Sequence, residues 1–341
     1  MIDAILTDNA LEERLTAPSE QDVAFASRLE GDLIILGAGG KMGPSLAQRI
    51  SRAIQRAGLK HRVIAVVRKD TNGVFLRLSD RVEVVEADLL DPKGFDNLPD
   101  APNVVFMVGR KFGSVADLPL TWATNSWIAG LAAQRFRHSR IVMFSTGNVY
   151  PFVSIDGPGA NERTPVAPTG EYAQSVLARE RIFEYFSTTN RTPILLFRLN
   201  YAIDLRYGVL LDICEKVSSG EPIDLTTGFV NIIWQGDANS YCLRSFALCD
   251  SPAGILNVTG PKKLSVRDVA ERFGHRLGKR PNFVGTEAET ALLSDASRCT
   301  QLLGPPGTSE EQLIEMTIDW YSAGGTTLGK PTRFERRDGN F

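Results

Sequence analysis

The stretch Asp32-Leu-Ile-Ile-Leu-Gly-Ala-Gly-Gly-Lys-Met-Gly-Pro44 indicates the fold class of this chain. A short apolar run leads into three glycines with the spacing Gly37-x-x-Gly40-x-x-Gly43, and Pro44 suits the first turn of a helix. The following residues have one apolar helical face, formed by Leu46, Ile50, Ile54 and Ala57. A buried strand, a tight turn and a helix N-terminus in this order predict backbone N–H groups that bind the pyrophosphate of a dinucleotide.

Apolar runs of the same kind recur along the first 200 residues. They cover residues 62–67, 81–87, 103–109, 140–145 and 193–198. Strands that alternate with helical stretches predict a parallel sheet with helices on both faces. After residue 200 the pattern loosens, although the apolar segment 230–234 has the character of a strand. The expected fold class is therefore α/β: a Rossmann-type doubly wound parallel sheet with a smaller C-terminal substrate lobe.

These patterns also suggest how the chain is divided. We expect an N-terminal helical extension over residues 1–30 and a dinucleotide-binding Rossmann domain over residues 31–200, to which residues 228–257 return. The substrate lobe is expected to comprise residues 201–227 and 258–325. The tail, residues 326–341, is polar and basic, a composition typical of disorder or of contact with another subunit.

The composition is that of an ordinary globular protein. Of 341 residues, 43% are hydrophobic and 23% charged, and the formal net charge of −2 argues against a nucleic-acid partner. No stretch has the roughly 20 apolar residues of a membrane span, and the acidic N-terminus is unlike a signal peptide. The four cysteines and three histidines are scattered, so we expect no metal site. A cytoplasmic protein with a small-molecule substrate, and without membrane or nucleic-acid contact, is the resulting expectation.

Further motifs follow the glycine loop (residues 37–43) in a definite order. They are Ala87-Asp88-Leu89, Val108-Gly109, Asn125, FSTGNVY at 144–150, EYAQSV at 171–176 and RLNYA at 198–202. On these residues the chain resembles, from about residue 31 to 300, the extended short-chain dehydrogenase/reductase family of NAD-dependent sugar epimerases and dehydratases. The resemblance implies a homodimer that pairs through two flanking helices.

The resemblance also implies roles for individual residues. Thr146 and Tyr172 would be the catalytic pair that acts on a hydroxyl or carbonyl beside the nicotinamide. The cofactor would contact the glycine loop through its three glycines and Lys41 and Met42, and further along the chain Asp88, Leu89, Val108, Gly109, Asn125 and Tyr172. Arg110 and Asn200 are expected to meet the substrate. Arg110 and Lys111 follow the fourth strand at its carboxyl end, where they would suit an anionic substrate or the phosphates of the cofactor.

One position departs from the family pattern. The family has a lysine one helical turn after the tyrosine, and this chain has Val176 there. A tyrosine with an ordinary pKa near 10 needs a nearby cation to act as a base at neutral pH. Either another cation replaces the lysine, or the chemistry is slow, or Tyr172 transfers no proton. Arg179 is a weak candidate for that cation, because it lies two helical turns beyond Tyr172.

The second strand carries the only sequence signal for the choice of cofactor. It ends in Arg68 and Lys69, which would suit the 2′-phosphate of NADP, whereas an NAD site usually has a carboxylate there. Asp70 is close enough to keep NAD open, so NADP is preferred only slightly.

The predicted function is an NAD(P)-dependent oxidoreductase or epimerase that acts on a secondary alcohol or carbonyl of a sugar-like substrate, with nucleotide sugars among the candidates. Two alternatives stay open. One is a catalytically impaired member that binds the dinucleotide as a sensor or while it holds a partner protein. The other is an NADPH-dependent carbonyl reductase that works without a tyrosine and lysine acid.

Overall fold

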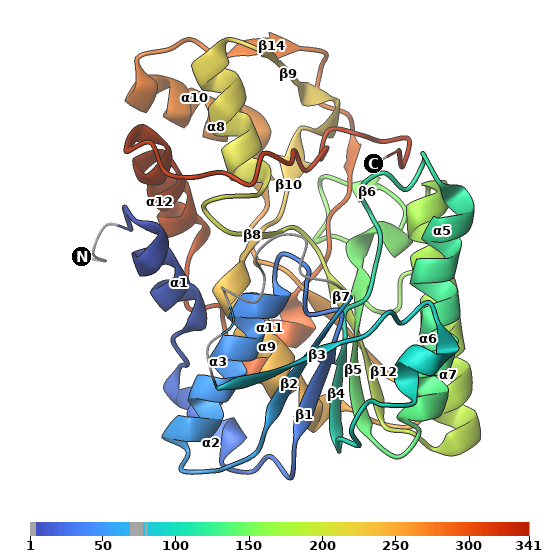
Figure 1. Cartoon of the computed structure of the whole chain (residues 1–341). Helices are drawn as coiled ribbons and strands as arrows, with labels where there is room; N and C mark the ends of the chain where they lie inside the picture. The colour runs from blue at the N-terminus through green and yellow to red at the C-terminus, as the bar shows by residue number, and fades with distance from the viewer. Residues whose placement is uncertain (1–4, 69–77, 79–80, 341) are drawn as a thin grey trace.

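A parallel sheet forms the centre of the molecule (Figure 1). The computed structural model describes residues 5–68, 78 and 81–340. Within them the sheet has seven strands, which are in spatial order β12 (Gly254–Val258), β7 (Ile194–Leu199), β5 (Arg140–Thr146), β4 (Asn103–Phe106), β1 (Leu33–Leu36), β2 (Val63–Val67) and β3 (Val82–Glu86). The predicted doubly wound sheet is confirmed, and β12 adds a strand that the apolar pattern did not indicate because the buried polar Asn257 interrupts it.

Helices cover both faces of the sheet because its strands are apolar on both sides. Leu33 and Ile35 pack with α2 (Glu20–Ala26), α3 (Gly43–Arg56), α9 (Gln235–Arg244) and α11 (Ser297–Leu303). Ile34 and Leu36 point the other way, toward η1 (Pro92–Phe95), α6 (Ile128–Arg135) and α7 (Gly170–Asn190). In Figure 1, α2 and α3 lie on one side of the sheet and α6 and α7 on the other.

A smaller lobe stands above the sheet in Figure 1. Its core joins α8 (Val209–Ser219), α10 (Val266–Leu277) and α12 (Glu310–Ser322) with Leu11 and Leu15 of the N-terminal helix α1 (Asp8–Thr16). The expected strand over 230–234 is divided between β10 (Phe229–Val230) and β11 (Ile233–Trp234), and neither joins the central sheet. They pair instead with β13 (Leu264–Ser265) and β8 (Ala202–Ile203) respectively.

The remaining elements are short and connect these layers. Two further strand pairs are β9 (Pro222–Asp224) with β14 (Asn282–Val284) and β6 (Val153–Ser154) with β15 (Thr290–Ala291). Single 3₁₀ turns are η3 (Gly147–Val149), η4 (Leu225–Thr227) and η5 (Ser245–Leu248). Helix α5 (Leu118–Trp122) runs into α6 through a π-helical turn, η2 (Ala123–Trp127), a distortion that is frequent at functional sites. Among the described helices, none combines the length and hydropathy needed to cross a membrane.

Residues 326–340, for which disorder or contact with another subunit was expected, pack against their own chain. Phe334 is buried in the core of the lobe, and Glu335 forms an ion pair with Lys216. Thr332 donates two hydrogen bonds, from its backbone N–H and its hydroxyl, to the buried carboxylate of Asp212. In Figure 1 the tail, in red, crosses between the lobe and the part that carries the sheet. A polar composition concealed this docking because a single phenylalanine supplies its main apolar contact.

Candidate active site

A cavity lies at the carboxyl ends of the central strands. It encloses about 1090 Å³ and is lined by the glycine loop, by the ends of β2, β4, β5 and β7, and by parts of the lobe and the tail. From β1 the chain adds β2 and β3 on one side and then returns to add β4 on the other side of β1. The strand order therefore reverses between β1 and β4. Parallel α/β sheets bind ligands at such a switch point, and the volume suits a dinucleotide together with a substrate.

The glycine loop has the geometry that a pyrophosphate requires. Gly37 has a φ of +85°, and a Cβ there would lie 2.8 Å from the backbone of Val108. A Cβ on Gly43 would lie 2.1 Å from the carbonyl oxygen of Ala38, so the start of α3 packs directly on the loop. Gly40 faces space, since only the Gly37 carbonyl oxygen lies near its Cβ position. A phosphate can therefore approach the backbone N–H groups at the N-terminus of α3, and the residues present fit a dinucleotide.

Most of the other predicted cofactor contacts line the same cavity. They are Lys41, Met42, Arg68, Asp88, Leu89, Val108 and Gly109. The Asp88 carboxylate accepts a hydrogen bond from the Leu90 backbone N–H at 3.1 Å and is exposed at the sheet edge. Lys69 lies outside the described residues, as does Asp70, so the slight preference for NADP rests on Arg68 and stays a prediction.

The two predicted catalytic side chains meet at the opposite end of the cavity. Thr146 ends β5, Tyr172 lies in the first turn of α7, and both side chains line the cavity. Asn148 fixes the threonine, because its backbone and side-chain N–H groups both donate to Thr146 Oγ1, at 3.2 and 3.0 Å. Burial raises the pKa of Tyr172 above its ordinary value. A nearby positive charge would therefore be needed for Tyr172 to release its proton at neutral pH.

That charge cannot come from Val176. Its side chain is buried in a small apolar cluster with Val149, Tyr150 and Ala160, and it does not line the cavity. Valine at this position therefore contributes packing between α7 and the loop after β5.

Arg179 supplies a positive charge at the same end of the cavity. Its buried guanidinium lines the cavity and donates to the backbone oxygens of Asn125 at 3.0 Å and Phe144 at 2.9 Å. Gly109 leaves room for it, because a Cβ there would lie 3.1 Å from Arg179 Nη2. The charge of Arg179 opposes the effect of burial on the pKa of Tyr172. Counting helical turns underestimated this residue, because long side chains on a helix lean toward its N-terminus.

A comparison of the sequence with family models identifies the group to which the chain belongs. The model of the NAD dependent epimerase/dehydratase family matches residues 33–203, half of the chain. The protein is a member of this family. The match begins at β1 and ends with β8, so it includes the glycine loop, Thr146 and Tyr172. No curated protein sequence matches the chain significantly.

Solved structures agree with the epimerase/dehydratase fold. MoeE5 in complex with UDP-glucuronic acid and NAD superposes with a TM-score of 0.69 at 18% identity, covering 86% of this chain and 100% of that chain. The dTDP-glucose 4,6-dehydratase of Bacillus anthracis, in complex with NAD, gives 0.71 at 16% identity, with 86% and 96% covered. The UDP-glucose 4-epimerase of Thermus thermophilus, also with NAD, gives 0.68 at 19% identity, with 85% and 99% covered.

Asn125, another predicted cofactor contact, lies in the protein interior. It is fully buried and does not line the cavity. Its Oδ1 accepts hydrogen bonds from the Arg110 backbone N–H at 2.8 Å and Arg179 Nη2 at 3.0 Å, while its Nδ2 donates to the Arg110 carbonyl and Ser175 Oγ. The amide is thus hydrogen-bonded within the protein, and the predicted cofactor contact of Asn125 stays a prediction.

The two residues expected at the substrate both line the cavity. Arg110 donates through Nη2 to the Gly113 carbonyl at 3.1 Å, and its buried Nε has no hydrogen-bond partner among the described residues. Asn200 is buried and donates to Asn231 Oδ1 at 3.1 Å. Arg110 Nε can therefore donate a hydrogen bond to a ligand, whereas the side-chain amide of Asn200 already donates one to Asn231.

A buried polar network holds α7, the helix that carries Tyr172, against the sheet. The sequence motifs did not indicate this network. Glu180 of α7 pairs with Arg198 of β7 through two hydrogen bonds of 2.8 and 2.6 Å, and also accepts from Ser145 Oγ at 2.5 Å. Arg198 Nη1 donates to the Tyr150 hydroxyl at 2.8 Å, which in turn donates to Asn257 Oδ1 at 2.8 Å. The network ties α7 to three strands of the sheet, so it fixes the helix that carries the tyrosine.

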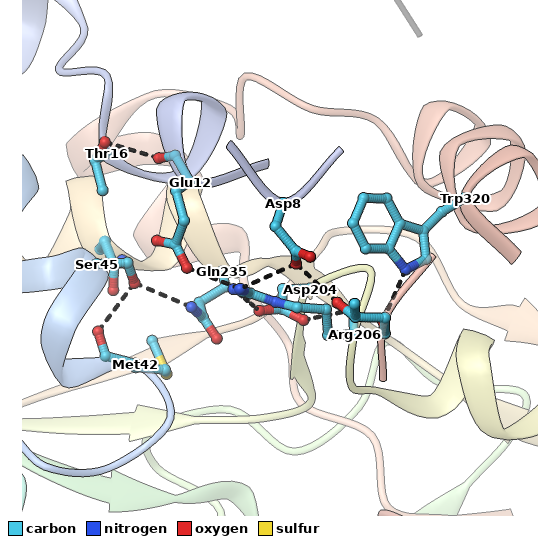
Figure 2. A network of polar contacts seen from close by, with 11 residues as sticks. Asp8, Glu12, Thr16, Met42, Ser45, Asp204, Arg206, Gln235 and Trp320 are labelled. Carbon is cyan, nitrogen blue, oxygen red and sulfur yellow. Dashed lines mark hydrogen bonds and ion pairs between the residues drawn. The ribbon is translucent and has the colours of Figure 1, made fainter. Parts of the chain in front are cut away.

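One wall of the cavity comes from residues outside the family match. Figure 2 shows Arg206 between the carboxylates of α1 and Asp204. Its guanidinium lies 2.8 Å from Glu12, 3.0 Å from Asp204 and 3.9 Å from Asp8. Thr326 of the tail donates to Asp8 Oδ1 at 2.7 Å. Sequence reasoning missed this wall, because no motif relates segments that are about 200 to 300 residues apart.

The described lining of the cavity is predominantly cationic. It has two carboxylates, Asp8 and Asp88, against seven basic side chains, namely Lys41, Arg68, Arg110, Lys111, Arg179, Arg206 and Lys330. Among residues 5–68, 78 and 81–340, no group of three or more His, Cys, Asp or Glu side chains is arranged to hold a metal ion. The cavity is therefore suited to anionic ligands, such as a dinucleotide and an acidic substrate.

Proposed function

We propose that this protein binds NAD and oxidises a secondary alcohol of a nucleotide-sugar substrate, transiently in an epimerase or dehydratase cycle. The observation that carries this proposal is that Thr146 and Tyr172 line the same cavity as the glycine loop. The family membership and the NAD and UDP-sugar complexes of similar folds support it. Selection of the sugar would fall to the lobe over residues 201–227 and 258–325.

The residues have distinct roles in this proposal. Bound NAD would accept the hydride from the alcohol carbon. Thr146 and Tyr172 bind the alcohol oxygen and hold it beside the nicotinamide position, and Tyr172 takes the hydroxyl proton. Arg179 supplies the positive charge that Val176 lacks and so stabilises the phenolate form of Tyr172.

A second candidate is a dinucleotide-binding sensor with impaired turnover. The raised pKa of Tyr172 favours it, since a protonated phenol at neutral pH is a poor base. The arginine that opposes this shift is itself engaged with backbone carbonyls, and burial lowers its pKa to about 10. A sensor and an enzyme would both bind NAD, and they differ in turnover.

We also propose a homodimer that pairs through the outer face of η2, α6 and α7. Trp127 and Tyr185 expose 54% and 63% of their surface on these elements, large values for aromatic side chains. Neighbouring helices of the same kind on a second copy would cover them. Sedimentation velocity of wild type and Tyr185→Lys tests this: wild type is expected to sediment as a dimer and the variant to be shifted toward the monomer.

The function is tested by identifying the ligand and then the reaction. Nucleotide released from the denatured protein is identified by mass spectrometry, and the emptied protein is titrated with NAD, NADH, NADP and NADPH. UDP-glucose, UDP-glucuronic acid and dTDP-glucose are then incubated with the NAD-loaded protein, with Tyr172→Phe as the comparison. Conversion of a sugar that Tyr172→Phe abolishes supports the proposal. Binding without turnover favours the sensor, selective NADPH binding favours the reductase, and no dinucleotide binding overturns all three.

The role of Arg179 has its own test. Arg179→Met is expected to lower kcat at least about 100-fold and to move the rising limb of its pH profile to higher pH, because the phenolate loses a stabilising charge. Arg179→Lys restores a cation and part of both effects. Arg181→Met, which removes an exposed arginine on the same helix, is the control. An unchanged pH profile in Arg179→Met with a lower kcat would show that the arginine only supports the fold.

A further inference from the structure

Three lysines from distant parts of the chain line the cavity. Lys41 belongs to the glycine loop, Lys111 follows β4, and Lys330 lies in the tail. Lys41 Nζ lies 3.1 Å from the centroid of the Tyr207 ring and 4.1 Å from that of Phe112. Lys111 Nζ lies 5.7 Å from the same Phe112 ring. Two of the amines therefore flank one aromatic side chain.

Hydrogen bonds on either side hold the third lysine at the cavity. The Leu328 backbone N–H donates to the Arg206 carbonyl at 3.0 Å, and the Thr332 backbone N–H donates to Asp212 Oδ2 at 2.8 Å. Lys330 lies midway between these two anchors. The tail thus presents its lysine from a fixed stretch of backbone rather than from a free end.

Gathering these charges without a ligand is unfavourable. Burial lowers the pKa of Lys41 to about 7, and the charges of Lys111 and Lys330 contribute to this shift. Asp204 and Asp212 oppose it, but Asp204 is paired with Arg206 and Asp212 accepts both hydrogen bonds of Thr332. Burial also lowers the pKa of Lys111, to about 8. An anion placed among the three amines would restore their full charge.

The position of the amines favours the substrate over the cofactor as the source of that anion. Lys111 Nζ lies 5.8 Å from the centroid of the Tyr172 ring, at the end of the cavity where the reacting oxygen would bind. The pyrophosphate of a dinucleotide already has the backbone N–H groups at the start of α3. Building on the proposed function, we propose that Lys41, Lys111 and Lys330 form a subsite for a phosphate or carboxylate group of the substrate. The substrate would then carry its acidic group within about one sugar ring of the reacting carbon.

The test uses the full chain and inorganic pyrophosphate as the probe. Isothermal titration calorimetry measures pyrophosphate binding to NAD-saturated wild type, Lys111→Met and Lys330→Met, and NAD binding to each protein. Lys279→Met removes an exposed lysine that does not line the cavity and is the control. We expect each cavity variant to weaken pyrophosphate binding at least about tenfold, with NAD affinity changed less than about twofold.

The outcomes separate the possible sources of the anion. Pyrophosphate binding that is unchanged in both variants overturns the subsite. A parallel loss of NAD affinity, with pyrophosphate and NAD competing, assigns the lysines to the cofactor and also overturns it. If wild type binds pyrophosphate but no dinucleotide, and the lysine variants lose pyrophosphate binding, the subsite is supported while the proposed function fails.

Proton uptake gives an independent readout. Pyrophosphate is titrated at pH 8 in two buffers with different ionisation enthalpies. Because Lys41 and Lys111 are then partly neutral, anion binding is expected to take up protons, and Lys41→Met is expected to reduce that uptake while Lys279→Met leaves it unchanged. Binding without proton uptake by wild type would contradict an anion at these amines.

Discussion

The two ends of the cavity are built in opposite ways. At the glycine-loop end, seven consecutive residues, 37–43, provide the turn, the close backbone approach and the helix start. Around Tyr172, the lining combines β5, α7 and the loop after β4. The first end depends on local backbone geometry and the second on long-range side-chain packing. A substitution should therefore damage one end while the other keeps its properties.

The largest expected effect is on the support of the Tyr172 end. Glu180→Leu leaves the buried guanidinium of Arg198 without its carboxylate, since the two side chains are 0% and 3% exposed. We expect the free energy of unfolding to fall by about 3 to 5 kcal/mol in urea denaturation. Glu184→Leu, which breaks the exposed pair with Arg181, should cost less than about 1 kcal/mol. A similar loss in both variants would mean that the buried network does not stabilise α7.

The next effect breaks the other end. In Gly43→Ala the new Cβ would lie 2.1 Å from the Ala38 carbonyl oxygen, so the start of α3 must move. We expect NAD affinity, measured by calorimetry, to fall at least about 100-fold. Gly58→Ala is the matched control, because Gly58 has a φ of +74° but no atom within 4 Å of its Cβ position. It should cost about 1 to 2 kcal/mol of stability and leave affinity unchanged. Equal affinity in Gly43→Ala and wild type would refute the role of the loop.

A third prediction concerns the anchor of the tail. Burial raises the pKa of Asp212 from 3.8 to about 6, so the folded protein holds this proton more tightly than the unfolded chain. The resulting stability is complete below about pH 4 and is lost as the pH rises through about 6, on the order of 3 kcal/mol in total. The stability of wild type and of Asp212→Asn is measured by thermal melting from pH 4 to 7. The stability of wild type relative to the variant should fall over this range, because the asparagine has no proton to lose. A difference that is independent of pH would contradict the raised pKa.

The smallest expected effect comes from breaking the contact between α1 and the tail, which together form one wall of the cavity. Thr326→Val removes the hydrogen bond to Asp8, and both residues are exposed. We expect a loss of about 0.5 kcal/mol in unfolding free energy and faster amide hydrogen exchange in α1. NAD affinity should not change, since the glycine loop is untouched. Unchanged exchange in α1 would show that the tail does not restrain it.

The fold was largely predictable because its determinants are local. Apolar runs, glycine spacing and the helical face after Pro44 predict six of the strands and their parallel arrangement. They do not indicate β12, since a five-residue strand with a buried asparagine lacks a continuous apolar run. The docking of the tail was missed for a related reason: a buried Phe334 and a hydrogen bond to Asp212 fix it, and neither has a sequence signature.

The site was predictable only in part. That Thr146 and Tyr172 line one cavity was predictable, because each follows a recognisable element at a family spacing. The contacts of Arg179 and Asn125 had no sequence signal, since they depend on where long side chains point and on which backbone groups need a partner. Lys330 had no signal, because its place at the cavity depends on the docking of a separate segment. A sequence motif predicts local backbone geometry more readily than it predicts which distant segment contributes side chains to the same cavity.

The wall shared by α1 and the tail has a consequence for how the protein is made. The ribosome completes Lys330 roughly 15 to 60 s after Lys41, at the usual rate of about 5–20 residues per second. During that interval the sheet and the glycine loop can form, while the side of the cavity that Thr326 and Lys330 close stays open. A nascent chain in a cell rich in dinucleotides would thus meet its cofactor before the substrate end of the site exists. The order of synthesis would then load the cofactor first and close the site around it afterwards.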